Sequence, residues 1–466
     1  MAPSRCVSAI TKRTASRWIS RMDWLKATAV QQGRAIMAGL LDPLDQAEAY
    51  LAAAKAHPDG WRIYARLTEA RARSEAIAAH DRARSELRRG LLDGVSISWK
   101  DNIDSGGTAT EAGSRLLESR VPAHDATILA QAAREGLVCL GKTHMTELAF
   151  SGLGLNPTTA TPPNAGDPAR APGGSSSGAA VSVALGLAAA AIGSDTGGSI
   201  RLPAAWNDIV GFMPTHGTLS LKGVVPLCRR FDVAGPLARS VEDCAEIMAI
   251  LTGNAVTDLK GASAKGLRLM VLDGAPFEDA EEGAVAAFTD AVERLARAGA
   301  RITHASPDSV AQILRLAPLL VAPEAYGIWR AQIEDAPELM HKPVLDRFRG
   351  GGQISAADYI AAWEKLTRLR RKWSAKVAGF DAILLPSCAI LPPDATRLEE
   401  DEEYFVRANQ LALRNTRLGN MLGLPAGSLP TGQRGCGIMA MGHAGRDRHL
   451  LRILAGMEHA LAARQA

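Results

Sequence analysis

Two serine-rich clusters carry the residues of this chain that are best suited to chemistry. The first, residues 172–178, has the sequence PGGSSSG, and the second, residues 193–201, has the sequence GSDTGGSIR. The segment between them, residues 179–192, is almost wholly small and apolar. Such a composition belongs in the interior of a protein, so we expect a buried helix that holds both clusters rigidly against the core.

The second cluster is suited to binding an oxyanion. Its centre consists of the small residues Thr196, Gly197 and Gly198. Successive small residues let backbone N–H groups converge on one point, as in the oxyanion holes of acyl-transfer enzymes. Ser199 follows directly and is placed to attack a carbonyl group there, while Asp195 and Arg201 are expected to pair and brace the turn. The alternative is that both clusters are ordinary Gly/Ser turns.

A lysine is the strongest candidate for the proton acceptor that a nucleophilic serine requires. Lys100 ends a predicted apolar strand, residues 95–99, and no histidine lies in either serine cluster. A free lysine has a pKa of about 10.4, but burial disfavours its charged form and lowers that pKa. A buried, neutral Lys100 would therefore act as a base, whereas most lysines are solvated surface charges.

Two familiar motifs match by letter but fail on their context. Residues 136–143 fit the phosphate-loop pattern GxxxxGK[ST], but residues 137–140 form a predicted buried strand and not a loop that could cradle phosphate. Residues 174–178 fit GxSxG, the nucleophile elbow of α/β-hydrolases, but no strand precedes them. The downstream His443 and His449 follow no clear acid-then-histidine order, so both interpretations are rejected.

Charge and composition set limits on the class of protein. The chain has 466 residues and a formal net charge of +4, with 47% hydrophobic and 22% charged residues, as in ordinary globular proteins. The excess positive charge depends on residues 1–21, an Arg- and Ser-rich leader without acidic residues. We expect this leader to be disordered or untranslated, with Met22 as the start, or else to be an organellar transit segment. The near-neutral remainder argues against a nucleic-acid partner.

The cysteines and the apolar segments indicate the compartment. The six cysteines are scattered without metal-binding spacing, which favours reduced, buried thiols, a cytoplasmic location and no structural metal. No stretch approaches 18 uninterrupted apolar residues, so we expect no membrane association.

The order of predicted elements favours one compact α/β domain over residues 22–466. Residues 22–90 have helical patterning, and residues 91–250 alternate short apolar strands, Gly-rich turns and Ala-rich helices. Strands are predicted at 95–99, 137–140, 267–272 and 382–385, and helices at 125–135, 284–298 and 446–463. Residues 305–375 form a variable, largely helical region.

The motifs together resemble the amidase signature family. The resemblance rests on GGSSSG at 173–178, GSDTGGSIR at 193–201, PAA at 203–205 and GFMPT at 211–215, with further pieces near 93–101, 141–143, 235–239 and 423–426. It implies a mixed, mostly parallel β-sheet covered by helices on both faces. It also implies a triad of Lys100, Ser175 and Ser199, in which a cis peptide precedes the bridging Ser175.

The resemblance further implies how the triad works. Lys100 takes a proton from Ser175, which takes one from the nucleophile Ser199, and an acyl-enzyme forms and is hydrolysed. Ser176, beside the bridging serine, has a supporting part. The sequence departs from the family pattern at Ser96, Trp99, residues 206–207, residues 212–213 and residues 435–438, which affects the pocket wall and packing but not the triad.

Three functions are compatible with this resemblance. The leading one is a stand-alone amidase that cleaves a small-molecule amide and needs no cofactor. The main alternative is the A subunit of a glutamine-dependent tRNA amidotransferase, in which an aspartate is expected a dozen positions before the last Gly-Leu-Pro proline. Residues 413–415 here are Leu-Arg-Asn, without an acid. A catalytically inactive interaction protein is disfavoured by the intact triad.

The substrate is not evident from the sequence. Arg315, Arg330 and Arg347 lie in the variable region and could meet an acidic substrate, but we expect all three to be ordinary surface arginines. A homodimer is compatible with the resemblance, because dimers are frequent among such relatives.

Overall fold

The computed structural model describes residues 23–462, so the predicted leader over 1–21 lies outside the described residues. An eleven-stranded mixed sheet runs through this part of the chain, in the order β1-β3-β2-β4-β6-β5-β10-β11-β9-β7-β8. Its strands are β1 (Tyr64–Leu67), β2 (Ser96–Lys100), β3 (Val138–Thr143), β4 (Ala190–Asp195), β5 (Val210–Met213), β6 (Val233–Ala238), β7 (Arg268–Leu272), β8 (Arg301–Ala305), β9 (Ala382–Pro386), β10 (Ala426–Pro430) and β11 (Gly437–Met441).

The sheet has two parallel groups with antiparallel strands between them. β2 is parallel to both β3 and β4, and β7 is parallel to both β8 and β9. The strands from β4 through β6, β5, β10 and β11 to β9 pair antiparallel, as does the edge strand β1 with β3. The mixed character predicted for the sheet is thus confirmed.

Helices pack on both faces of the sheet, as predicted. Leu269, Val271 and Leu384 belong to one hydrophobic cluster, whereas the alternating residues Met270 and Leu385 belong to another. This alternation is the period of two expected when both faces of a strand are buried. The first cluster includes α3 (Pro43–Ala56), α6 (Thr127–Arg134), α9 (Val241–Thr252), α10 (Glu282–Arg297) and α16 (Asp447–Ala462).

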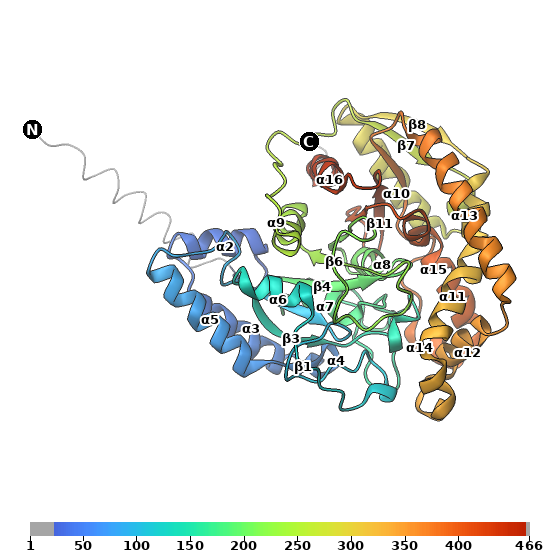
Figure 1. Cartoon of the computed structure of the whole chain (residues 1–466). Helices are drawn as coiled ribbons and strands as arrows, with labels where there is room; N and C mark the ends of the chain where they lie inside the picture. Colours follow the sequence, from blue (N-terminus) through green and yellow to red (C-terminus); the bar gives the residue numbers. More distant parts are fainter. Residues whose placement is uncertain (1–22, 463–466) are drawn as a thin grey trace, which may run out of the picture.

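The variable region is a helical layer on the second face. It contains α11 (Ser309–Asp335), α12 (Lys342–Gly351) and α13 (Ala356–Val377), and α15 (Glu402–Leu422) packs against α11. These orange helices lie at one side of the molecule, opposite the blue N-terminal helices α2 (Ala29–Met37), α3 and α5 (Glu69–Arg84) (Figure 1). The largely helical character predicted for residues 305–375 is therefore confirmed.

Most predicted elements are present with shifts of one to three residues at their ends. The rejected phosphate loop is indeed strand β3, which contains both Gly141 and Lys142. The segment 179–192 is buried as predicted, but it is not a single helix. Helix α7 (Ser177–Ala184) ends at a turn around Gly186, and the chain then enters β4.

Between Asp23 and Ala462, none of the helices combines the length and apolarity needed to cross a bilayer.

Candidate active site

Two parallel strands and one helix bring the predicted triad residues to the same edge of the sheet. Lys100 is the last residue of β2, and Ser199 lies just beyond the end of β4, the strand that pairs parallel with β2. Ser175 lies two residues before α7, which packs on both strands. The peptide between Gly174 and Ser175 is cis, as the resemblance implied.

Lys100 is fully buried and contacts hydroxyl groups in place of carboxylates. Its Nζ donates to Ser175 Oγ at 2.7 Å, to Ser194 Oγ at 2.9 Å and to the Ser194 carbonyl at 3.3 Å. Asn102 Nδ2 also donates to Ser194 Oγ, at 2.9 Å. Sequence reasoning assigned no role to Ser194, which adjoins Asp195, or to Asn102, which lies two residues after Lys100.

This environment favours a neutral amine. Burial lowers the pKa of Lys100 to about 7, and the negative charges of Asp195 and Asp232 oppose only part of that shift. A lysine with this pKa exchanges protons readily at neutral pH, as a general base must. Lys100 at this strand end therefore meets the physical requirement for the base that the sequence predicted, and its catalytic role stays a prediction.

Ser199 lies where a substrate could reach it. Its side chain is almost fully buried, yet the residue lines a cavity of about 790 Å³ together with Thr196 and Gly197. The two serine clusters are joined where the Ser176 N–H donates to the Ser199 carbonyl at 3.2 Å and the Ser176 hydroxyl donates to the Ser194 carbonyl at 3.1 Å. Within residues 23–462 the Ser175 and Ser199 hydroxyls share no hydrogen bond; such contacts often tighten only when substrate binds.

A buried carboxylate organises the turn before Ser199. Asp195 accepts hydrogen bonds from the Gly198 N–H at 2.7 Å and the Ile200 N–H at 3.0 Å, and it forms an ion pair with Arg201 at 3.0 Å. Burial alone would raise the pKa of Asp195, but the charge of Arg201 and these hydrogen-bond donors have the larger effect, so the pKa of Asp195 is lowered. The pairing predicted between Asp195 and Arg201 is confirmed.

The same contacts distinguish the three predicted oxyanion residues. Because the Gly198 N–H is already donated to Asp195, it is not free to bind an oxyanion. The backbone N–H groups of Thr196, Gly197 and Ser199 donate no hydrogen bond within the described residues. They are the donors left for a developing negative charge, and their role stays a prediction.

Distant residues that the sequence did not indicate hold the turn from outside. Asp232 accepts from the Thr196 hydroxyl at 2.6 Å. On α15, the Thr416 hydroxyl donates to the Gly197 carbonyl at 2.8 Å and Asn420 Nδ2 donates to Asp195 Oδ1 at 2.8 Å. Single polar residues far along the chain carry no spacing signal, so only the structure could find them.

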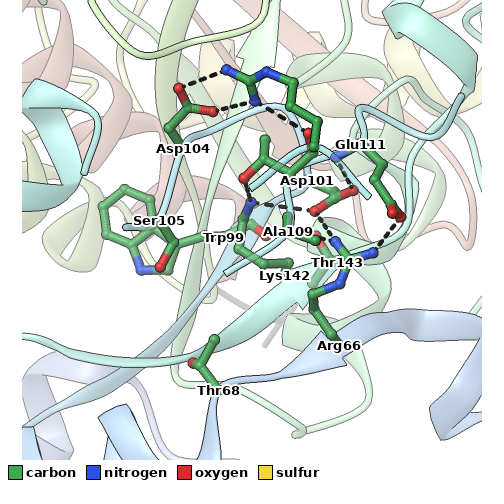
Figure 2. A network of polar contacts seen from close by, with 12 residues as sticks. Arg66, Thr68, Trp99, Asp101, Asp104, Ser105, Ala109, Glu111, Lys142 and Thr143 are labelled. Carbon is green, nitrogen blue, oxygen red and sulfur yellow. Dashed lines mark hydrogen bonds and ion pairs between the residues drawn. The ribbon is translucent and has the colours of Figure 1, made fainter. Parts of the chain in front are cut away.

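A network of charges fixes the end of strand β2 beside Lys100. Asp101 accepts from Arg66 at 2.8 Å and from Lys142 at 3.2 Å, and the Glu111 N–H adds a third contact at 3.1 Å (Figure 2). Lys142 also donates to Thr110 Oγ1 at 3.0 Å. The lysine of the rejected phosphate motif therefore neutralises a buried carboxylate.

Helices of the variable region build much of the cavity wall. Arg315 and Arg347 line the cavity, so the expectation that they are ordinary surface arginines is wrong for Arg347, which is half-buried. Arg315 is exposed at the rim, and Arg330 is exposed and not part of the lining. The sequence could not separate them, because which face of a helix meets a cavity depends on tertiary packing.

Comparison with known proteins agrees with this geometry. The Amidase family model matches residues 45–451. A 2-amino-5-chloromuconic acid deaminase of Comamonas testosteroni is 34% identical over 84% of this chain and 86% of its own length. The A subunit of the glutamyl-tRNA(Gln) amidotransferase of Sulfurisphaera tokodaii is 30% identical over 83% of this chain and 89% of its own.

The fold has solved counterparts as well. A crystal structure described as an amidase superposes with a TM-score of 0.83 and 30% identity, covering 93% of this chain and 99% of that one. The family model spans most of the chain, and the fold agrees over 93% of it. The chain therefore belongs to the Amidase family and is a hydrolase that acts on amide carbon–nitrogen bonds.

Proposed function

We propose that this protein hydrolyses a small-molecule carboxamide through a Ser–Ser–Lys relay and an acyl-enzyme. The observation that carries the proposal is the 2.7 Å contact between the buried Lys100 amine and Ser175, at the edge of the sheet where Ser199 lines the cavity. Neutral Lys100 accepts the Ser175 proton, Ser175 accepts the Ser199 proton, and Ser199 Oγ attacks the amide carbon.

The remaining steps return the relay to its starting state. The N–H groups of Thr196, Gly197 and Ser199 stabilise the tetrahedral oxyanion. Ser175 then delivers a proton to the leaving nitrogen, the carbon–nitrogen bond breaks, and ammonia or an amine departs. A water molecule, deprotonated by the same relay, attacks the ester that remains on Ser199 and releases the carboxylic acid.

The amidotransferase component is a second candidate, because several relatives carry that name. Residues 413–415 lie on α15 and are Leu-Arg-Asn, and Arg414 and Leu413 line the cavity where the resemblance implied an acid. The deaminase relative is named for an amino-substituted acid and not for a tRNA. Together these observations favour a stand-alone hydrolase over the amidotransferase component.

The test is ammonia release by the purified protein on aliphatic, aryl and dicarboxylic amides and on glutamine, with Ser199→Ala as the matched variant. We expect turnover of at least one simple amide and a loss of at least about a thousandfold in Ser199→Ala. A fluorophosphonate probe should label the wild type and not the variant. Turnover of glutamine alone would favour the amidotransferase, and turnover that survives in Ser199→Ala would refute the relay.

A further inference from the structure

Four arginines line the cavity that contains Ser199, of which Arg315 is exposed at the rim and Arg414 donates to backbone carbonyls of Pro276 and Glu278. The other two are Arg347 and Arg417. Arg347 comes from α12 and Arg417 from α15, and both line this cavity. Within residues 23–462 neither guanidinium forms an ion pair with a carboxylate, and the charge that acts most directly on Arg347 is that of Arg417. By contrast, the buried Arg201 pairs with Asp195. Two half-buried positive charges beside each other repel, and a bound anion would relieve that repulsion.

Their surroundings hold the two side chains without neutralising them. The Arg347 guanidinium stacks 4.3 Å from the centre of the Phe150 ring and donates one hydrogen bond to the Phe150 carbonyl at 2.7 Å. A guanidinium has five N–H donors, so most of those on Arg347 stay available. Burial lowers the pKa of Arg347 to about 9 and that of Arg417 to about 10, so both stay charged at neutral pH.

Arg417 lies beside the turn that contains the predicted oxyanion donors. It directly follows Thr416, whose hydroxyl donates to the Gly197 carbonyl, and its Nε would lie 3.9 Å from a Cβ placed on Gly197. An anion held by Arg417 would therefore lie close to a carbonyl group at Ser199. The wall also contains Phe150, Leu227 and Leu413, which can pack against a short methylene chain.

The positions of the acidic residues in the cavity wall limit the class of ligand that can bind there. The carboxylates that line this cavity, those of Glu278, Asp346 and Glu402, belong to exposed residues at its rim. Asp346 and Glu402 both pair with Lys342. The inner wall thus offers positive charge for a carboxylate but no carboxylate for an ammonium group, which disfavours a zwitterion such as glutamine.

We propose that the substrate is the monoamide of a short dicarboxylic acid, whose free carboxylate is bound by Arg347 and Arg417 while Ser199 attacks its amide carbonyl. This proposal rests on the proposed amidase function and specifies its substrate class. Paired guanidinium–carboxylate contacts are the strongest directional interactions available for recognising such a group.

The test compares glutaramate, which carries one carboxylate, with the neutral diamide glutaramide. We expect the wild-type kcat/KM to be at least about a hundredfold higher for glutaramate, since hydrogen bonds to charged groups each contribute about 1.5–3 kcal/mol, or roughly tenfold to a hundredfold. Arg417→Gln and Arg347→Gln should each reduce this preference about tenfold or more, chiefly through KM. Arg330→Gln, an exposed arginine on α11 outside the cavity, is the matched control and should keep the preference.

A binding measurement keeps the proposal independent of turnover. In the Ser199→Ala background, calorimetry should detect glutarate binding more tightly than glutaramide, and Arg417→Gln should weaken glutarate binding about tenfold or more. Equal binding of both compounds, or equal binding with and without Arg417, would overturn the carboxylate site. Ser199-dependent hydrolysis of neutral amides without any preference for glutaramate would also overturn it, while leaving the proposed amidase function intact.

Discussion

At the scale of single residues, the proposed relay depends on keeping the amine of Lys100 uncharged. Lys100 is surrounded by the hydroxyls of Ser175 and Ser194 and by the Ser194 carbonyl, none of which carries a charge. An adjacent carboxylate would have held the lysine protonated. The nearest buried carboxylate in sequence, Asp101, is instead bound by Arg66 and Lys142 (Figure 2).

This environment predicts the pH dependence of the reaction. Burial lowers the pKa of Lys100 to about 7, so the neutral base is present above that pH and lost below it. We expect kcat/KM to fall about tenfold per pH unit below pH about 7 and to level off above it. A pH profile of kcat/KM for an amide without an ionisable group measures this directly.

A pair of variants separates this explanation from a structural one. Lys100→Arg keeps a positive charge that cannot be released, so it should abolish turnover at every pH even if the protein folds. Arg330→Gln should reproduce the wild-type profile, because that side chain is exposed and outside the cavity. If Lys100→Arg is still active and its kcat/KM still falls below pH about 7, then the group that titrates is not Lys100.

Much of the candidate site could be predicted from the sequence, for a definite reason. Ser175, Ser199 and Lys100 lie in long local patterns, where neighbouring residues constrain one another. Asp232 and Thr416 were missed because each is a single polar residue that only folding brings to the turn.

At the scale of elements, the turn before Ser199 is held by a buried ion pair that also anchors α15. Arg201 contacts Asp195, donates to the Thr416 carbonyl at 2.7 Å and reaches Asn420 Oδ1 at 2.5 Å. Both charges are fully buried, and removing one leaves the other without compensation.

We therefore expect Arg201→Met to destabilise the fold by about 3–5 kcal/mol. The measurement is denaturant unfolding followed by circular dichroism. Arg268→Met is the matched control, because it breaks an exposed ion pair with Asp381 and should leave the unfolding midpoint nearly unchanged. Equal midpoints for both variants would show that the buried pair does not hold the turn.

The same turn has room for a Cβ at Gly197 but not at the following residue, Gly198. Gly198 has a φ of +138°, and a Cβ there would lie 2.0 Å from Thr416 Oγ1. A Cβ at Gly197 would meet nothing closer than 3.9 Å. We expect Gly198→Ala to lower the melting temperature by several degrees and Gly197→Ala to change it little, as measured by differential scanning fluorimetry. Similar melting temperatures would contradict this account of the turn.

Helices and strands could be predicted from the sequence where a short run of neighbouring residues has the pattern of that element. Strands β2, β3, β7 and β9 follow from short apolar runs, whereas β1 was missed because its sequence, YARL, alternates no better than the helices around it. The composition of residues 179–192 predicts a buried helix, but small apolar residues suit a buried helix and a buried strand equally well. The antiparallel pairing around β10 and β11 joins strands far apart in the chain, which no local pattern encodes.

At the scale of the whole molecule, the cysteines belong to the packed interior. The five cysteines among the described residues, Cys139, Cys228, Cys244, Cys388 and Cys436, are all buried and free. Burial raises the pKa of Cys139 to about 11 and that of Cys436 to about 11. A thiol with a raised pKa has little of the reactive thiolate form at neutral pH.

In a Cys6→Ser variant, which removes the thiol outside the described residues, we expect no rapid reaction with Ellman's reagent in the native state. All five remaining thiols should react at once in denaturant. The colour yield with and without denaturant measures both. Rapid native labelling of any one thiol would show that its part of the core opens readily.

The placement of α11 to α13 has a consequence for how such an enzyme can diverge. Lys100, Ser175 and Ser199 lie within residues 96–201. The continuous stretch 309–377 contains α11 and α12, which form one wall of the cavity, and α13, which packs on α11 (Figure 1). A duplicated gene can therefore accumulate changes, or accept a recombined segment, in that stretch without altering the strands that hold the proposed nucleophile and base. Descendants would inherit one reaction and acquire different substrates, and exchanging residues 309–377 between paralogues is the laboratory version of the same event.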